Sequence, residues 1–200
     1  MERIKPRTLS GFMELLPAKQ AQFDRIADTL RHVYSLYGFT ALDTPLIESS
    51  EVLLAKGGGE TEKQIYRFQK GDADLSLRFD LTVPLAKYVA QNYGSLTFPF
   101  RRYQIGKVYR GERAHRGRFR EFYQADIDII GDGTLDTIND AEIPSIIYRT
   151  FSTLTQAFPD PGQQPENSQR LLCFPGADGE IRRYHAHSGQ AGKNRCRNRF

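Results

Sequence analysis

The chain has 200 residues, a formal net charge of +4, and a composition that is 39% hydrophobic and 12% aromatic. This is the length of one ordinary domain, and the apolar content is enough to form a core, which excludes disorder over most of the chain. No apolar run approaches the ~20 residues that span a bilayer, the first residues lack the apolar segment of a secretion signal, and two cysteines do not make a disulfide framework. We therefore expect a soluble, cytoplasmic protein of mixed helices and strands.

The first predicted element is an amphipathic helix. Pro17 suits the first turn of a helix, and Gly38 suits the position just after its end. Between them, apolar residues recur every three or four positions and form one apolar face: Phe23, Ile26, Leu30, Val33 and Tyr37.

An extended segment over residues 39–48 is expected next. Because Pro45 cannot donate a ladder hydrogen bond, this strand is predicted to lie at a sheet edge or an interface. Ser50 is expected to cap a short helix over residues 51–56, which ends at the glycines 57–59.

Two hairpins are predicted in the middle of the chain. Residues 65–68 and 75–79 flank a short segment rich in Gly and Asp, which is a hairpin signature, and a helix then runs to Gly94. The longest extended segments, 100–110 and 119–130, are expected to pair as a second, longer antiparallel hairpin.

A last helix carries Ile143, Ile146, Ile147 and Phe151, with Pro144 near its first turn. Helices combined with antiparallel strands, rather than alternating βαβ units, indicate the α+β class, with an antiparallel sheet flanked by helices.

Residues 155–200 lack the patterning of the rest. Their apolar residues follow neither the helical nor the strand period, and the segment is rich in Gly, Pro, Gln and Asn. We expect a disordered or loosely attached tail. Two alternatives stay open: a basic nucleic-acid-binding segment over residues 193–199, and a metal site made by Cys173, His185, His187 and Cys196, although neither cysteine has a nearby partner of the kind structural zinc sites prefer.

Basic residues are concentrated in the predicted long hairpin. Residues 101–120 contain eight Arg and Lys residues and a single acidic one, Glu112. Arginine forks suit phosphate oxygens, so this hairpin is a candidate site for a triphosphate or a nucleic-acid backbone. The alternative is an ordinary solvated basic face.

The second strand of this hairpin has two different faces. Residues two apart share a face, so Phe122, Gln124, Asp126 and Asp128 line one side, whereas the other side is mostly apolar and is predicted to be core. A row of polar groups beside the arginines indicates a binding floor, with a plain solvent-facing strand as the alternative. Asp80, taken alone, is interpreted as a cap of the helix that follows it.

Several segments, taken in order, resemble the class II aminoacyl-tRNA synthetases and specifically the histidyl-tRNA synthetases. The matching segments are residues 7–17, 37–48 (motif 1), 77–84, 100–113 and 117–124 (the two halves of motif 2). Together they cover roughly residues 5–152, so that residues 1–154 are expected to form part of a class II catalytic domain. The resemblance implies activation of histidine with ATP to histidyl-adenylate, transfer to tRNA(His), and a homodimer formed through the motif 1 region.

The resemblance also implies roles in binding ATP. Arg110 would hold the α-phosphate and act as the catalytic residue. Glu112 would contact the adenine side, Arg113 and Arg118 would serve the outer phosphates and the motif 2 loop, and Phe122 would stack on adenine. Mg²⁺ would neutralise the departing pyrophosphate, and no metal-ligating residues of the protein itself are expected.

For histidine, the resemblance implies a second group of residues. Asp80 and Thr82, with Leu81 between them, would bind the amino group, and Gln124 would lie beside it. Asp128 would face the imidazole, where a carboxylate favours one tautomer and the charged form.

The resemblance stops near residue 153. Family members continue into a second histidine-binding segment, a further ATP-binding motif and an anticodon-binding domain, none of which follows here. A patterned body joined to an unpatterned tail is typical of a shifted reading frame, so we expect a truncated or frameshifted product that is weakly active or inactive. The DNA downstream of the codon for Leu154 tests this expectation.

Two other functions stay open on the sequence. One is the synthetase-like regulatory subunit of ATP phosphoribosyltransferase, which would bind histidine without catalysis; the intact 110–112 segment disfavours it because such a subunit need not hold ATP. The other is a general single-stranded nucleic-acid binder that stacks bases on Tyr103, Tyr109 and Phe119.

Overall fold

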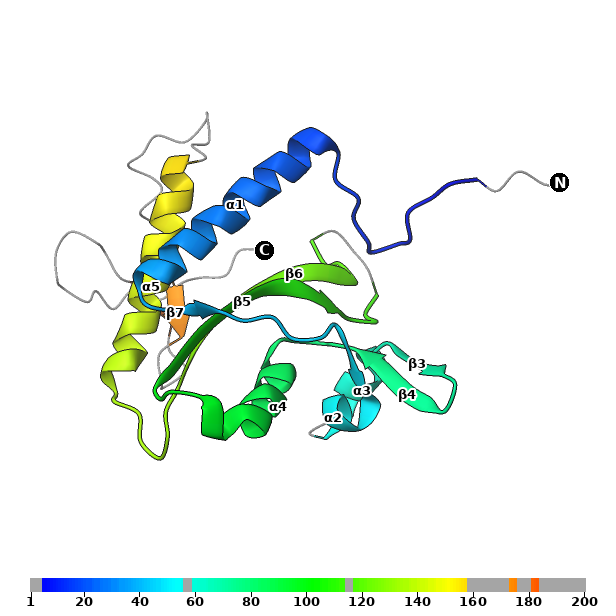
Figure 1. Cartoon of the computed structure of the whole chain (residues 1–200). Coiled ribbons are helices and arrows are strands. Elements are labelled where there is room, and N and C mark those ends of the chain that lie inside the picture. Colours follow the sequence, from blue (N-terminus) through cyan, green and yellow to red (C-terminus); the bar gives the residue numbers. More distant parts are fainter. Residues whose placement is uncertain (1–4, 56–58, 114–116, 158–172, 176–180, 184–200) are drawn as a thin grey trace. The chain divides into compact units, whose positions relative to one another are not determined.

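A computed structural model describes residues 5–55, 59–113, 117–157, 173–175 and 181–183 (Figure 1). Contacts within the chain divide it into two units, Met1–Ile143 and Pro144–Phe200. The first unit contains the two sheets and all the predicted site residues.

Helix α1 (Pro17–Leu36) has Pro at its first turn, where the missing N–H would have no helical partner. It ends before Gly38, whose φ of 74° lies in the left-handed region that favours glycine. The predicted helix is therefore confirmed at both ends.

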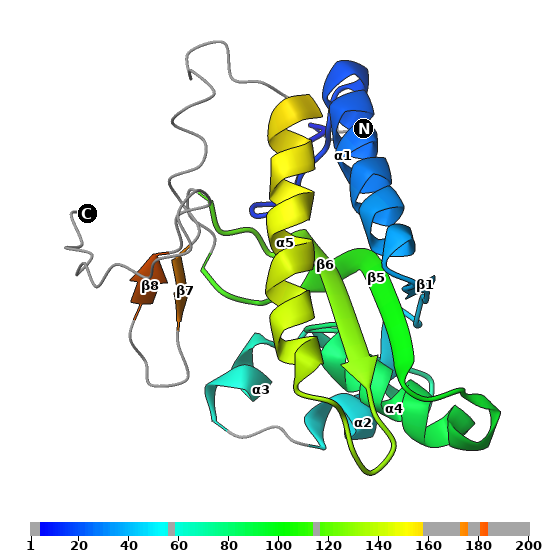
Figure 2. The same cartoon turned by 90° about the vertical axis from the view of Figure 1, so that its left-hand side faces the viewer.

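The first sheet has the order β1-β5-β6, with β1 (Thr40–Ala41) parallel to β5. Strands β5 (Phe100–Tyr109) and β6 (Glu121–Ile130) pair antiparallel along their whole length, from Phe100 opposite Ile130 to Tyr109 opposite Glu121. They run side by side in both views (Figures 1 and 2). The predicted long hairpin is confirmed.

The second sheet has the order β2-β4-β3, formed by β2 (Ile47–Ser49), β3 (Arg67–Lys70) and β4 (Ala73–Leu77). The first hairpin is confirmed, but β3 lies two residues nearer the turn than predicted because Gly71, at φ 60°, permits a tight connection. The predicted extended segment 39–48 instead forms two short strands in different sheets, β1 and β2, with Pro45 in the connection between them. Both are edge strands, as predicted.

The short helices differ from the prediction in two ways: Ser50 does not act as a cap, and a second short helix, which was not predicted, follows the first. Helix α2 (Ser50–Leu54) begins at Ser50, whose hydroxyl does not cap it. Instead the hydroxyl bonds Asp74 Oδ1 at 2.9 Å and Ser76 Oγ at 2.8 Å, because Ser50 is buried against β4. Helix α3 (Glu60–Gln64) follows.

Helix α4 (Thr82–Asn92) continues into a short 3₁₀ turn, η1 (Tyr93–Ser95), in agreement with the predicted end near Gly94. Helix α5 (Ile138–Ala157) starts earlier than predicted, so Pro144 lies inside it rather than in its first turn. The start is set by Asp136, whose Oδ1 accepts a hydrogen bond from the Ile138 N–H at 2.9 Å. The α+β class is confirmed.

The two faces of the β5–β6 hairpin are covered by different elements. The rings of Phe23 and Tyr34 in α1 contact Tyr123 and Tyr103 at centroid distances of 4.6 and 5.6 Å. On the other face, Gly106 lies against Arg78 and Leu81, at the start of α4. Figure 1 shows α1 and α4 on opposite sides of the hairpin.

In the second unit, β7 (Cys173–Pro175) and β8 (Ile181–Arg183) pair antiparallel. The alternative metal site needs His185, His187 and Cys196, and the basic segment needs residues 193–199, all of which lie outside the described residues. The predicted change at residue 154 stays a prediction. None of the helices in the described part of the chain has the length and apolar content needed to cross a membrane.

Candidate functional site

One face of the β5–β6 hairpin collects polar side chains from both strands, and we call it the polar face. Its members are Arg102 and Gln104 of β5 and Gln124, Asp126 and Asp128 of β6. The register places Arg102 opposite Asp128 and Gln104 opposite Asp126. Arg102 is 0% exposed and Gln104 is 1% exposed, so this face is not the plain solvent-facing strand that was the alternative.

The opposite face is less buried than predicted. Tyr123, which was assigned to the core, is 45% exposed, and Ala125 is also exposed. In this unit α1 covers that face through individual ring contacts, such as Phe23 on Tyr123, rather than along its whole length. The strand alternation was therefore correct, but the burial of the two faces was assigned the wrong way round at these positions.

The polar face carries buried atoms without hydrogen bonds. They are the three guanidinium nitrogens of Arg102, Oε1 of Gln104, Oε1 of Gln124 and Oδ2 of Asp128, none of which has a well-aligned hydrogen bond among the described residues. Two of these atoms, Arg102 Nη2 and Asp128 Oδ2, form an ion pair at 2.6 Å, so the two amide oxygens are left without any polar partner in the described part of the chain. Buried polar groups are normally satisfied. A concentration of unsatisfied donors and acceptors on one face is what a site for a polar ligand requires.

Two carboxylates on this face are electrostatically perturbed. Burial raises the pKa of Asp126. The positive charges of Arg102 and Arg110 lower this pKa, and the negative charges of Asp128 and Asp80 raise it further. Burial also raises the pKa of Asp128, against the lowering effect of Arg102. The five charged side chains are thus close enough to influence one another, which places Asp80 and Arg110 near the polar face.

Arg110 lies just beyond the end of β5. Its backbone N–H donates to the Arg120 carbonyl at 2.9 Å, so the hairpin pairing continues to this point. Its guanidinium carbon is 4.5 Å from the ring centre of Phe79 and 5.0 Å from that of Phe122, and its Nε donates to the Phe79 carbonyl at 3.4 Å. Two aromatic faces therefore hold this guanidinium without neutralising its charge.

Asp80 does cap helix α4, as the isolated motif indicates. Its Oδ1 accepts hydrogen bonds from the N–H groups of Thr82 at 3.1 Å and Val83 at 3.0 Å. Leu81 is fully buried, whereas Thr82 is exposed. The cap fixes the turn, and the half-buried carboxylate still faces toward the charges of the polar face.

The remaining predicted ATP residues lie around the hairpin turn. Arg118 forms an ion pair with Glu112, which is largely buried. Arg113 is exposed. The structure therefore brings Arg118 and Glu112 together, and this ion pair must open before the two residues can contact different parts of a ligand.

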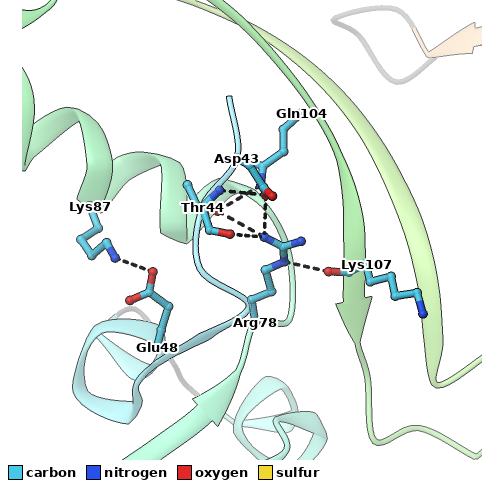
Figure 3. Close-up of polar contacts among 7 residues, drawn as sticks. All are labelled: Asp43, Thr44, Glu48, Arg78, Lys87, Gln104 and Lys107. Atoms are coloured by element: carbon cyan, nitrogen blue, oxygen red, sulfur yellow. Dashed lines mark hydrogen bonds and ion pairs between the residues drawn. The ribbon is translucent and has the colours of Figure 1, made fainter. Parts of the chain in front are cut away.

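A network around Arg78 joins the elements that carry the site (Figure 3). Arg78 Nε donates to the Lys107 carbonyl at 2.7 Å, and its Nη1 donates to the Thr44 carbonyl at 2.7 Å. Gln104 Nε2 donates to Asp43 Oδ1 at 2.9 Å and to Thr44 Oγ1 at 3.1 Å. These bonds tie the 39–48 segment and the β4–α4 turn to β5.

A second contact in Figure 3 supports the same segment. Glu48, which is 8% exposed, forms an ion pair with Lys87 of α4. A buried carboxylate needs such a partner. The 39–48 segment is therefore fixed at both ends by residues distant in the sequence.

Most of the basic cluster is engaged inside the fold. Arg101 pairs with Glu142 at 2.9 Å, Lys107 with Glu121 at 2.9 Å, and Arg120 donates to the Glu112 carbonyl at 2.9 Å. Arg102 forms an ion pair with Asp128 at 2.6 Å, and Arg118 pairs with Glu112 as described above. The cluster is consequently much less available to an external polyanion than its composition indicates.

Sequence reasoning named Asp126 and Arg102 only as members of a face and of a basic cluster, and it did not name Arg78 or Gln104 as site residues. The same alternation that was applied to residues 119–130 finds Arg102 and Gln104 when it is applied to residues 100–110, because even-numbered residues there share the polar face. Arg78 had no local signal, since its partners lie about 30 residues away on either side.

Comparison with known proteins agrees with this arrangement. The sequence profile of the family described as histidyl-tRNA synthetase matches residues 11–157. The histidine–tRNA ligase of Clostridium tetani is 70% identical over 151 residues, and that of Stenotrophomonas maltophilia is 52% identical over 164 residues. These matches cover 76% of this chain but only 34% and 35% of the relatives, so the chain spans about a third of their length.

Solved structures give the same result for the fold. The crystal structure of histidyl-tRNA synthetase from Nostoc sp. PCC 7120 matches with a TM-score of 0.67 and 43% identity, over 74% of this chain and 34% of that chain. An ATP phosphoribosyltransferase regulatory subunit/histidyl-tRNA synthetase from Bacillus halodurans has the same fold, with a TM-score of 0.65 at 24% identity, over 76% of this chain and 38% of that chain. With a family profile that matches most of its length, the chain belongs to the histidyl-tRNA synthetase family.

Proposed function

We propose that this chain carries the site for the first step of histidine–tRNA ligation, in which histidine and ATP form histidyl-adenylate and release pyrophosphate. Family membership supports the reaction, and the charge distribution supports its location. The observation that carries the proposal is the position of Arg110, held between two aromatic rings beside a row of carboxylates. The part of the site at Arg110 suits phosphate, and the part at the carboxylates suits the positive charge of an amino acid.

Arg110 would take the α-phosphate because it forms no ion pair with any residue that the structure describes. Phe122 would stack on adenine with the ring face that Arg110 leaves open, and Glu112 would contact the adenine side. Arg113 and Arg118 would serve the outer phosphates, with Arg113 exposed and Arg118 released from Glu112 when the nucleotide binds.

Histidine would lie along the polar face. Asp80, Leu81 and Thr82 would receive its ammonium group, Gln124 would lie beside it, and Asp128 would face the imidazole. The buried Oε1 of Gln124 lacks a hydrogen-bond partner among the described residues, and an N–H group of histidine would supply one. Asp128 would accept through Oδ1, since its Oδ2 is paired with Arg102.

The chemical step is mainly positioning and electrostatics. A carboxylate oxygen of histidine attacks the α-phosphorus, the new P–O bond forms, and the bond to pyrophosphate breaks. The fixed guanidinium of Arg110 stabilises the negative charge that develops on the α-phosphate oxygens.

Mg²⁺ supplies charge neutralisation on the departing pyrophosphate when it is bound. The described residues contain no cluster of three or more potential protein ligands, so we propose that the ion enters with the phosphates of ATP. For the whole protein, we propose transfer to tRNA(His), action in the cytoplasm, and a homodimer formed through the motif 1 region, residues 37–48, where Pro45 and Ile47 are exposed.

Asp80 permits a sharp experiment because its two roles can be separated. Asn caps helices about as well as Asp, so Asp80→Asn is expected to leave the stability within ~0.5 kcal/mol while it weakens histidine binding about tenfold through the lost charge. Isothermal titration of the chain with histidine and with ATP measures both affinities. Asp80→Ala, which loses the cap as well, is the control. Absence of histidine binding by the unaltered chain would overturn the proposal.

The regulatory-subunit alternative is distinguished by the same titrations. It predicts histidine binding without ATP binding, whereas the proposed site predicts both. The high identity to histidine–tRNA ligases favours the ligase, since the likeness to the Bacillus halodurans protein shows only a shared fold. The general nucleic-acid binder is disfavoured because most of its arginines are already paired.

A further inference from the structure

Arg102 is the most deeply buried charged residue on the polar face, and the proposed mechanism gives it no role. Its side chain is 0% exposed, and none of its three guanidinium nitrogens makes a well-aligned hydrogen bond among the described residues, so that its polar contact there is an ion pair. Burying a guanidinium costs several kcal/mol unless the charge is compensated. The compensating group is Asp128, whose Oδ2 lies 2.6 Å from Arg102 Nη2.

The two partners differ in their access to solvent. The Asp128 side chain is 36% exposed, yet its Oδ2, the atom that meets Arg102, is fully buried. The exposed part of Asp128 is therefore the rest of the side chain. One carboxylate oxygen faces inward to the guanidinium, and the other is left for a ligand.

The charges around Asp128 show what Arg102 contributes. Asp126, on the same strand face, and Asp80, at the start of α4, are both negative, and Tyr34 of α1 also interacts with Asp126. The other nearby cation, Arg110, acts on Asp126. Arg102 is the only charged side chain that lowers the pKa of Asp128 among the described residues, against burial, which raises it.

We infer that Arg102 is a positioning residue for histidine recognition, which holds one oxygen of Asp128 so that this carboxylate stays ionised and oriented for the ligand. The inference rests on the proposed function for the identity of the ligand. Arg102 acts from beneath Asp128 and does not itself touch histidine. Its removal leaves the buried Asp128 without its cation and on the same strand face as Asp126, so that Asp128 takes up a proton more readily.

The first test uses Arg102→Met, Asp128→Asn and the double variant, with Arg101→Met as the matched control. Arg101 is the neighbouring arginine on the opposite face, where it pairs with Glu142. Isothermal titration measures histidine and ATP affinities at several pH values. Arg102→Met is expected to weaken histidine binding about tenfold near neutral pH, more as the pH falls, with ATP affinity unchanged within about twofold.

Because Arg102 acts through Asp128, the double variant is expected to lose no more histidine affinity than Asp128→Asn alone. Additive losses, or equal losses for histidine and ATP, would overturn the inference, since both are what a merely structural arginine produces. Arg101→Met is expected to change neither affinity.

The second test does not depend on the ligand. Carbon-13 NMR of the side-chain carboxyl groups follows the titration of Asp128, which is expected to move to higher pH in Arg102→Met and to stay close to its original position in Arg102→Lys, which keeps the charge. If Arg102→Met does not fold, Arg102→Lys takes its place as the test of the inference. Weaker histidine binding, with the titration of the Asp128 carboxyl group at its original pH, supports the inference. Unchanged histidine binding refutes it. If the unaltered chain binds no histidine, the proposed function fails, and the carboxyl titration alone decides the role of Arg102.

Discussion

Replacing Arg78 by Met removes the central residue of the network in Figure 3. Arg78 is 3% exposed and donates hydrogen bonds to the carbonyls of Lys107 and Thr44, both at 2.7 Å. Each charge-assisted bond is worth about 1.5–3 kcal/mol, and both carbonyls would be left without this donor. Methionine recovers part of the loss because it needs no desolvation of charge. We therefore expect Arg78→Met to lower the free energy of unfolding by about 3–5 kcal/mol.

The control for this variant is Arg67→Met. Arg67 also forms an ion pair, with Asp74, but its side chain is 58% exposed, so its loss is expected to destabilise the fold much less than the loss of Arg78. Urea unfolding followed by far-ultraviolet circular dichroism measures both, since the chain has no Trp to report by fluorescence. If the two variants unfold within about 1 kcal/mol of each other, the network does not hold the site together as argued.

Three further outcomes are expected. A Cβ at Gly106 would lie 2.4 Å from Arg78 Nη2, so Gly106→Ala should cost about 1–3 kcal/mol in urea, whereas Gly94→Ala, with open space, should be near neutral. Burial raises the pKa of Asp126, so ionisation of this carboxyl group disfavours the fold as the pH rises. The free energy of unfolding of Asp126→Asn should therefore increase relative to that of the unaltered chain between about pH 4 and about pH 7. A difference between the two that does not change with pH would contradict this. Burial and a hydrogen bond to Glu121 raise the pKa of Tyr109 to about 12, so the unaltered chain loses stability from about pH 10 upward as this tyrosine ionises. Tyr109→Phe should lose less stability than the unaltered chain over the same range, which thermal unfolding measures.

The elements that the sequence predicts well are those whose signals are local. The apolar repeat of α1, bounded by Pro17 and Gly38, contains both its periodicity and its ends, and the long hairpin has continuous strand patterning on both sides of a glycine-containing turn. The errors at Ser50 and Pro144 have one cause. Each residue has a common role at a helix start, and in each case a different contact decided the outcome: burial against β4 for Ser50, and the Asp136 cap for Pro144.

The part of the candidate site that lies on β6 was predictable in its membership but not in its burial. Alternation along β6 correctly grouped Gln124, Asp126 and Asp128, because the two-residue period is a property of the strand itself. Which face is covered depends on segments distant in sequence. Here the turn at Arg78 and Leu81 covers the polar face, and no pattern within β6 contains that information.

The basic cluster shows how composition and structure lead to different functional expectations. Eight basic residues against one acidic residue predict a strongly positive surface. Yet the carboxylates that neutralise them, such as Glu142, Glu121 and Asp128, come from outside that stretch of sequence, so a local charge count could not include them. Among the described members of the cluster, Arg110 is held by aromatic rings instead of a carboxylate, and Arg113 is exposed. A few unpaired guanidinium groups select particular phosphate positions, whereas eight free basic groups would bind any polyanion, so the pairing of the cluster favours the proposed nucleotide site over general polyanion binding.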